Sequence, residues 1–214
     1  MKVWDISRSL SDDLPPWPGD TPFHFELMAR LGQGAVVNVG AIRTSVHNGS
    51  HADARYHFEN NGWTIEQVGL ETYLGPAVVV DLSAEFQTGQ RQEIGIAHLN
   101  GSANHLAQTS RLLLKTNVWP GNTAFPKSIP VIAAGVAEWL QEKKVGLIGL
   151  DLPSVDPIDA KQLYNHHALA RCGIAIIESL DLTAVEPGIY NFAALPLKIA
   201  GGDAAPVRAA LWRD

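Results

Sequence analysis

The sequence predicts an α/β fold with a mostly parallel core sheet. The chain has 214 residues, of which 46% are hydrophobic and 18% are charged, so it has ordinary globular composition and can bury one sizeable core. In its second half, continuous apolar runs typical of buried strands alternate with helical patterns. We therefore expect one compact domain over residues 1–214.

The first third of the chain is predicted to form strands and turns. Residues 3–6 are a short alternating segment, and three prolines make residues 14–20 a rigid loop. Residues 23–31 and 36–46 suit two strands, with the turn Gly32-Gln33-Gly34 between them.

From residue 76 onward, strands and helices are predicted to alternate. Buried strands are expected at residues 77–82, 111–116, 145–151 and 174–178. Helices are expected at residues 93–99, 136–143 and 157–172. Asp156 should be the N-cap of the last helix, Pro157 its first residue and Gly173 its C-terminal stop. Two more strands are expected in residues 191–212.

Composition and charge exclude several classes of protein. Lys plus Arg number 16 and Asp plus Glu number 22, for a net charge of -6. The basic residues are scattered, which argues against a nucleic-acid binder. The single cysteine, Cys172, rules out an intramolecular disulfide and a cysteine-based zinc site. Because neither a signal segment nor an apolar run of about 18 residues is present, we expect a cytoplasmic protein that does not enter a membrane.

Three histidines and an aspartate are concentrated in one short segment, as His47, His51, Asp53 and His57. On an ideal strand they would share a face, but His47 and Asp53 would then lie roughly 20 Å apart. On a helix, Asp53 would point away from the first two histidines. A shared metal site therefore requires a bend, which we expect at Asn48-Gly49-Ser50, where a strand ends in a tight loop. Surface histidines that are close only in sequence are the alternative.

A second candidate group lies far along the chain. His166 and His167 belong to the expected last helix, and Glu178 ends the strand that follows it. Ligands of open α/β sheets gather at the carboxyl ends of strands, and a carboxylate that emerges from an apolar run needs a partner such as a cation. Imidazole and carboxylate ligands suit zinc and its first-row neighbours. Two such ions can polarise a carbonyl and hold a hydroxide nucleophile. A solvated glutamate at a strand end is the alternative.

The segment from His47 to Phe58 resembles the His-x-Gly-Thr-His-x-Asp-x-Pro-x-His-Phe signature of the cyclase-like metal-dependent hydrolases. The stretch Trp17-Pro18-Gly19-Asp20-Thr21 is similar to the arylformamidase branch of that family. Further resemblance covers residues 4–7, 151–157, 166–169 and 177–182. The chain departs from the signature at Ser50, where the family has Thr, and at Arg55, where it has Pro. Serine keeps the hydroxyl, whereas Arg55 removes a φ restraint and adds a cation near the site.

The resemblance implies a fold of the swivelling β/β/α type, a homodimer and two zinc ions per chain, with Mn²⁺ or another divalent ion as the alternative metal. It makes His47, His51 and His166 metal ligands and makes Asp53 and Glu178 bridging carboxylates. His166 is favoured over His167 because its spacing to Glu178 matches the family, so His167 is expected to pack nearby.

The implied reaction is the hydrolysis of N-formyl-L-kynurenine to L-kynurenine and formate. His57 is implied to be the proton donor and acceptor, and Trp17 a substrate contact. Arg43, Arg55 and Ser154 are candidate anchors for the amino-acid end of the substrate.

Two rival functions remain open. One is the hydrolysis of another amide or of a lactone by a member of the same family. The other is a non-catalytic protein that binds a metal only to stabilise its fold. A serine hydrolase is excluded because the sequence has no Gly-x-Ser-x-Gly elbow.

Overall fold

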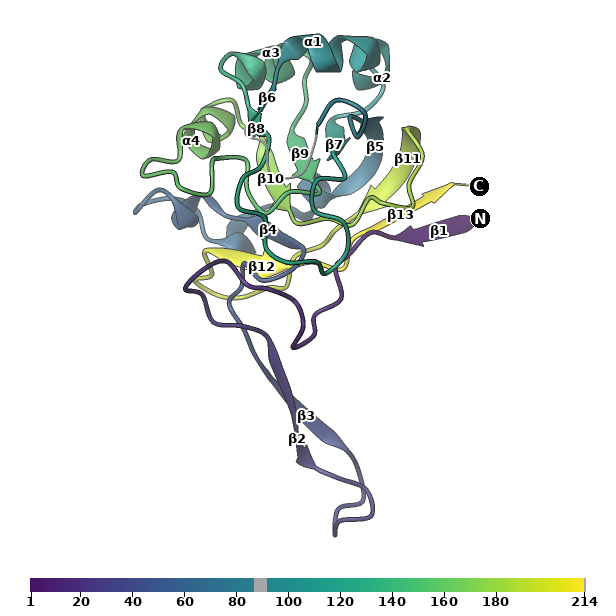
Figure 1. The fold of residues 1–214 in the computed structure, drawn as a ribbon, viewed down its shortest axis with the longest axis vertical. Helices are drawn as coiled ribbons and strands as arrows, with labels where there is room; N and C mark the ends of the chain where they lie inside the picture. The colour runs from purple at the N-terminus through teal and green to yellow at the C-terminus, as the bar shows by residue number, and fades with distance from the viewer. Residues whose placement is uncertain (87–91, 214) are drawn as a thin grey trace.

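The computed structural model describes residues 1–86 and 92–213. A large mixed sheet forms the body of the molecule (Figure 1). In spatial order, its nine strands are β1 (Lys2–Asp5), β13 (Ala210–Arg213), β11 (Gly188–Ala193), β5 (Leu74–Asp81), β7 (Arg111–Lys115), β9 (Leu147–Leu150), β10 (Ala175–Glu178), β4 (His51–Asp53) and β12 (Ala204–Pro206).

Parallel pairing is confined to the middle of this sheet. The strands β5, β7, β9 and β10 are parallel neighbours and correspond to the four expected buried strands. The strands on both flanks pair antiparallel, so the sheet is mixed rather than mostly parallel. The central strands are joined by helical crossovers, as parallel pairing requires, whereas the flanking strands return to the sheet through turns and loops.

Both faces of the central strands are buried. Leu112 and Leu114 belong to one hydrophobic cluster together with Val136 and Leu140 of the helical layer. Leu113, between them, points to the opposite face and joins a second cluster. Since successive side chains of a strand alternate between faces, burial on both sides explains the continuous apolar runs in the sequence.

The helices are short and cover part of the sheet (Figure 1). They are α1 (Ile96–Leu99), α2 (Ala103–Leu106), α3 (Val136–Glu142) and α4 (Tyr164–Arg171), with 3-10 turns η1 (Arg55–His57), η2 (Ile65–Gln67), η3 (Leu70–Tyr73) and η4 (Asn100–Ser102). A small parallel pair is formed by β6 (Glu93–Ile94) and β8 (Val131–Ile132), so the expected helix at residues 93–99 is split between β6 and α1. In the described part of the chain, no helix is long and apolar enough to cross a membrane.

The last helix is shorter than the sequence predicts. It begins at Tyr164 rather than at Pro157, and turns occupy the residues between. Asp156 nevertheless acts on the helix, because its carboxylate accepts hydrogen bonds from first-turn amides that include the N–H of His166. Gly173 ends the helix as expected, with φ of 72° and a Schellman pattern of hydrogen bonds.

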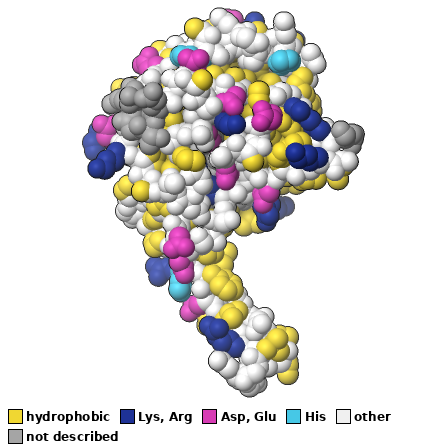
Figure 2. Space-filling view, turned by 45° about the vertical axis from the view of Figure 1, so that its right-hand side comes forward, with side chains coloured by type: hydrophobic (Ala, Val, Ile, Leu, Met, Phe, Trp, Pro, Cys, Tyr) yellow, Lys and Arg dark blue, Asp and Glu magenta, His cyan; other side chains and the backbone are white. Residues whose placement is uncertain are grey.

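A two-stranded hairpin, β2 (His24–Ala29) paired with β3 (Val39–Arg43), projects from the body (Figure 1). We call residues 24–43 the hairpin arm. The two strands expected in this region are confirmed, with narrower bounds. Apolar side chains remain exposed along the arm, as Figure 2 shows; they are Phe25, Met28, Leu31, Val36, Val37, Val39 and Ile42.

Candidate metal centre

A cavity of about 670 Å³ lies at the carboxyl end of β10. Its lining includes His47, His51, His57, His166 and Glu178. The structure thus brings together the two groups of candidate residues that are separated by more than 100 positions in the sequence.

Strand pairing positions the first group. β4 lies between β10 and β12, and in this register His51 is directly opposite Glu178. The expected bend lies at residues 48–50, where Gly49 adopts a φ of 72° that favours glycine. The strand β3 ends at Arg43 before this loop, as expected, although earlier than predicted, and β4 follows the loop. The turn places His47 beside His51, with ring centroids 5.0 Å apart.

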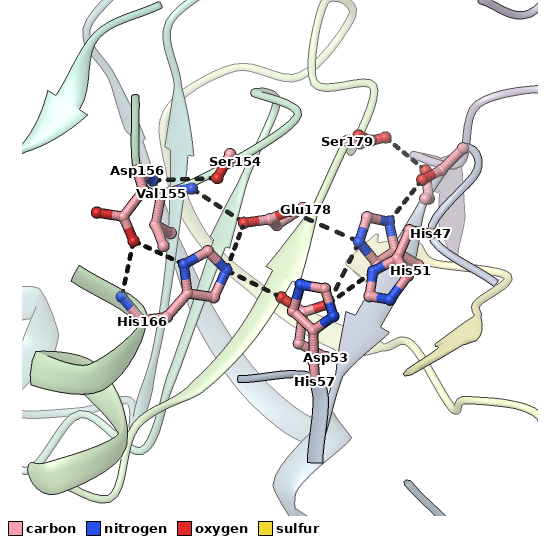
Figure 3. A network of polar contacts seen from close by, with 12 residues as sticks. His47, His51, Asp53, His57, Ser154, Val155, Asp156, His166, Glu178 and Ser179 are labelled. Carbon is pink, nitrogen blue, oxygen red and sulfur yellow. Dashed lines mark hydrogen bonds and ion pairs between the residues drawn. The ribbon is translucent and has the colours of Figure 1, made fainter. Parts of the chain in front are cut away.

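Asp53 belongs to two groups of potential metal ligands. One group contains His47 and His51, and the other contains His166 and Glu178 (Figure 3). Asp53 Oδ1 lies 3.3 Å from His47 Nδ1 and 3.4 Å from His51 Nε2. Its Oδ2 lies 3.4 Å from His166 Nε2. Glu178 repeats this arrangement, with Oε2 at 3.6 Å from His51 Nε2 and Oε1 at 3.5 Å from His166 Nε2.

These separations fit ligands around a metal ion better than hydrogen bonds. N–H···O hydrogen bonds usually measure about 2.7–3.2 Å. Zinc ligands at about 2.0–2.2 Å in tetrahedral geometry lie roughly 3.3–3.6 Å from one another. Within the described residues, His51 Nε2 and both oxygens of Asp53 are buried without any hydrogen-bond partner. A divalent cation would satisfy all three of these atoms.

Each of the three histidines that face Asp53 also has an acceptor for its other ring nitrogen. His47 Nε2 donates to Asp203 at 2.8 Å, and His166 Nδ1 donates to Asp156 at 2.7 Å. His51 Nδ1 donates to the carbonyl of Gly49 at 2.9 Å. Such bonds fix the ring orientation and leave the inner nitrogen free to bind a metal, an arrangement that is usual for metal-ligating histidines.

The ionisable side chains of the centre shift one another's pKa values. Burial alone lowers the pKa of each histidine, but the carboxylates beside the rings outweigh burial and raise the pKa to about 9 for His47 and to about 10 for His51 and His166. Burial raises the pKa of Glu178, and the charge of Asp53 adds to this effect. Burial also opposes ionisation of Asp53, but its three histidine partners hold its pKa well below the usual value. Metal binding would therefore replace protons that the imidazoles otherwise hold.

His57 lies at the edge of this group and remains 31% exposed at its side chain. Its ring centroid is 4.1 Å from that of His47, and its Nδ1 is 3.6 Å from Asp203. Burial lowers the pKa of His57, and the cationic forms of His47 and His166 lower it further. A neutral imidazole facing the cavity is suited to accept a proton. His47, His57 and Asp203 also form a group that could hold a metal ion.

The cavity has an aromatic wall made by Trp17, Trp119 and Phe125. The ring of Phe125 makes edge contacts with both tryptophans, at centroid distances of 5.4 Å in each case. Trp17 lies in the expected proline-rich loop. Trp119 and Phe125 were not predicted from the sequence, although they follow β7 at its carboxyl end, where ligands of such sheets gather.

The three candidate anchors for the amino-acid end of the substrate lie in different parts of the structure. Ser154 lines the cavity, whereas Arg43 ends β3 in the hairpin arm. Arg55 lines a separate cavity of about 380 Å³, and its guanidinium donates to the carbonyl of Ala170 at the end of α4. Arg55 thus ties the histidine loop to α4. His167 packs against Phe58 at a centroid distance of 5.3 Å, as expected.

Ser50 shows why the hydroxyl of the signature matters. Its Oγ donates to the carbonyl of Ser179 at 2.6 Å and accepts from the N–H of Arg8 at 2.9 Å. Ser179 has a φ of 59°, which is unusual for a residue other than glycine. The serine hydroxyl therefore helps to fix the turn that follows Glu178.

The chain is similar to known proteins over most of its length. The model of the Cyclase family, described as "Putative cyclase", matches residues 4–157. The kynurenine formamidase of Geobacillus thermodenitrificans (strain NG80-2) is 45% identical over 212 residues, covering 99% of this chain and 98% of the relative. The kynurenine formamidase of Bacillus thuringiensis subsp. konkukian (strain 97-27) is 41% identical, covering 97% and 95%.

A solved structure has a similar fold over nearly the whole chain. It is described as a potential metal-dependent hydrolase with cyclase activity and is 25% identical to this chain. The TM-score is 0.78, and the match covers 98% of this chain and 96% of the other.

Proposed function

The chain belongs to the Cyclase family, and from this premise we propose that it is a kynurenine formamidase, which hydrolyses N-formyl-L-kynurenine to L-kynurenine and formate. The observation that carries the proposal is the juxtaposition of two features in one cavity. The cavity is lined by His51, whose Nε2 is a buried ligand atom without a hydrogen-bond partner among the described residues, and also by the aromatic wall. The first suits a metal-dependent hydrolase, and the second suits a substrate with an aryl ring.

The proposed centre holds two divalent ions, with zinc as the expected metal and Mn²⁺ as the alternative. His47 and His51 would bind one ion, and His166 the other. Asp53 and Glu178 would bridge them, which is supported by the way each carboxylate directs one oxygen to His166 and the other to His51. When bound, such ions supply a Lewis acid for the formyl oxygen and lower the pKa of a water molecule.

His57 is the proposed proton carrier. It takes a proton from the attacking water as oxygen bonds to the formyl carbon, and it donates that proton to the aniline nitrogen as the C–N bond breaks. Water is thereby divided between the two products, formate and the free amine. The lowered pKa of His57, caused first by burial, supports its neutral form as the starting state. The carboxylate of Asp203 lies 3.6 Å from Nδ1 of His57, so a negative charge is available beside the protonated ring.

The aryl ring of the substrate is proposed to pack against Trp17, with Phe125 and Trp119 behind it. Large, rigid aromatic side chains bind a planar ring at low entropic cost. Ser154, which lines the same cavity, is the proposed contact for the amino-acid end.

The remaining features of the assembly are also proposals. The exposed apolar side chains of the hairpin arm support a homodimer, because a contiguous apolar surface on a projecting element usually meets a partner. The similarity to bacterial formamidases over nearly the full chain supports a single domain over residues 1–214, the swivelling β/β/α type of fold and a cytoplasmic location.

A substrate panel tests the proposed function. Purified, zinc-replete protein is incubated with N-formyl-L-kynurenine, an aryl lactone and an unrelated linear amide, and the products are quantified. Equimolar kynurenine and formate, with much slower turnover of the other compounds, is the expected result. Preferred turnover of the lactone or of the other amide would assign the chain to a different reaction of the same family. Bound metal without turnover of any compound would favour a structural metal site.

A further inference from the structure

Arg8 is buried beneath the cavity although it is charged, with only 4% of the residue exposed. Its guanidinium donates hydrogen bonds to the backbone carbonyls of Trp119, Gly121, Asp151 and Ser179. Among the described residues, no carboxylate forms an ion pair with it. A buried cation is tolerated only when its hydrogen-bond donors are satisfied. The four carbonyls satisfy the donors of Arg8, and they are the groups that Arg8 holds in place.

The four carbonyls come from different segments. Two belong to residues 116–126, which follow β7 and which we call the aromatic loop. Asp151 and Ser179 directly follow β9 and β10. Arg8 therefore ties the aromatic loop to the carboxyl ends of two neighbouring strands. The start of the loop is fixed separately, because Asp151 accepts hydrogen bonds from Thr116 and Asn117.

Arg8 also contacts the aromatic wall directly. Its guanidinium carbon lies 3.8 Å from the centroid of the Trp119 ring, which is a close cation–π contact. From Trp119, edge contacts continue through Phe125 to Trp17. One continuous row of packed groups thus links the buried cation to the side chain proposed to bind the aryl ring.

We propose that Arg8 is a positioning residue that holds the aromatic loop in place and so sets the affinity for the aryl substrate. The substrate part of this inference rests on the proposed function. Arginine is required because its planar fork reaches several carbonyls while it stacks on the indole ring. A lysine would keep the charge but could neither fork nor stack in the same way.

The kinetic test compares Arg8→Lys with Arg208→Lys as a matched control. Arg208 is an exposed arginine whose guanidinium pairs with Asp5. Arg8→Lys is expected to raise KM for N-formyl-L-kynurenine about tenfold, to leave kcat within about threefold and to leave the metal content unchanged. The control is expected to match the wild type. An unchanged KM, or a loss confined to kcat and metal content, would overturn the proposal.

A double-mutant cycle tests whether Arg8 acts through Trp119. Trp119→Leu alone is expected to raise KM, and Arg8→Lys added to it should raise KM by no more than about twofold further. Effects on KM that multiply fully would contradict the proposal, since Arg8 would then act by another route. Trp119→Leu retains Arg8, so an unchanged KM in this variant overturns the proposal even if Arg8→Lys fails to fold.

Hydrogen exchange separates this inference from the proposed function. Amides of residues 116–126 are expected to exchange faster in Arg8→Lys than in the wild type, while α3 and β5 exchange as before. Failure of the wild type to release kynurenine would refute the proposed function. Unchanged exchange in the aromatic loop would refute the positioning role of Arg8, whatever the substrate is.

Discussion

His51 and Glu178 lie opposite each other in the antiparallel pairing of β4 with β10, and His51 Nε2 is 3.6 Å from Glu178 Oε2. Both residues are almost fully buried. Among the described residues, His51 Nε2 has no hydrogen-bond partner, and Glu178 accepts the N–H of Val155 through its other oxygen, Oε1. A strand pair therefore holds an imidazole and a carboxylate at the distance of two ligands of one ion. The rigid sheet, rather than a loop, fixes the core of the proposed centre.

The first prediction concerns Asp156, which orients His166 through its Nδ1. Asp156→Asn is expected to weaken metal affinity by about 10–100-fold, because such supporting carboxylates fix the ring and raise its basicity. Competition with a chromogenic chelator measures this affinity. Asp12→Asn, in an exposed residue beside His24, is the control and should bind metal as the wild type does. Equal affinity in both variants would show that Asp156 serves only the helix.

The second prediction concerns His57, which is proposed to transfer protons rather than to bind metal. His57→Ala is expected to lower kcat by about 10²–10⁴-fold, since general acid–base catalysis contributes that much. The metal content should stay unchanged, as measured by elemental analysis of the same samples. Loss of metal together with activity would instead assign His57 to the third potential ligand group, with His47 and Asp203.

The third prediction concerns the aromatic wall. Trp17→Leu is expected to raise KM for N-formyl-L-kynurenine about tenfold, because loss of a ring contact typically costs about 1 kcal/mol or more. Steady-state kinetics measures the effect. Trp63→Leu is the matched control, because Trp63 is exposed and does not line this cavity. Equal changes in the two variants would argue against a specific contact between Trp17 and the substrate.

The fourth prediction concerns pH and stability after metal removal. His47, His51 and His166 have pKa values of about 9 to 10 in the folded chain, against 6.5 as the ordinary value. Burial lowers each pKa, but the carboxylate partners more than compensate. Groups with a raised folded pKa stabilise the fold fully below the unfolded pKa, and this stabilisation is lost as pH rises through the folded pKa.

Chelator-stripped protein should therefore lose thermal stability as pH rises from about 6.5 to about 10. Metal-loaded protein should show a much weaker dependence over that range, because its imidazoles are neutral ligands throughout. Melting temperatures of both forms across this pH range test the expectation. Parallel curves for the two forms would mean that the histidines are not protonated in the metal-free centre.

Local signals in the sequence predicted the central part of the fold. Apolar runs identified β5, β7, β9 and β10, and the glycine after α4 marked the end of that helix. The antiparallel flanks could not be predicted in this way. β4 and β12 are three-residue strands, and their pairing depends on contacts between segments about 150 residues apart. Such short strands have no periodicity of their own.

The residues of the site were likewise predictable only where the signal in the sequence is local. The spacing of His47, His51 and Asp53 indicated a bend, and the structure has it at the expected residues. Asp203 could not be found from spacing, because it reaches His47 only through the pairing of β12 with β4. Arg8 was missed because a lone arginine in a serine-rich segment carries no local signal for burial.

The proposed pair of metal ions, bridged by Asp53 and Glu178, is expected to support hydrolysis of an aryl formamide. Titration of chelator-stripped protein with Zn²⁺ tests it most directly, with the rate of kynurenine release from N-formyl-L-kynurenine recorded at each step. We expect negligible turnover without metal and a plateau at two equivalents per chain. A plateau at one equivalent would contradict the bridged pair, and full turnover in the stripped protein would contradict the role of the metal itself.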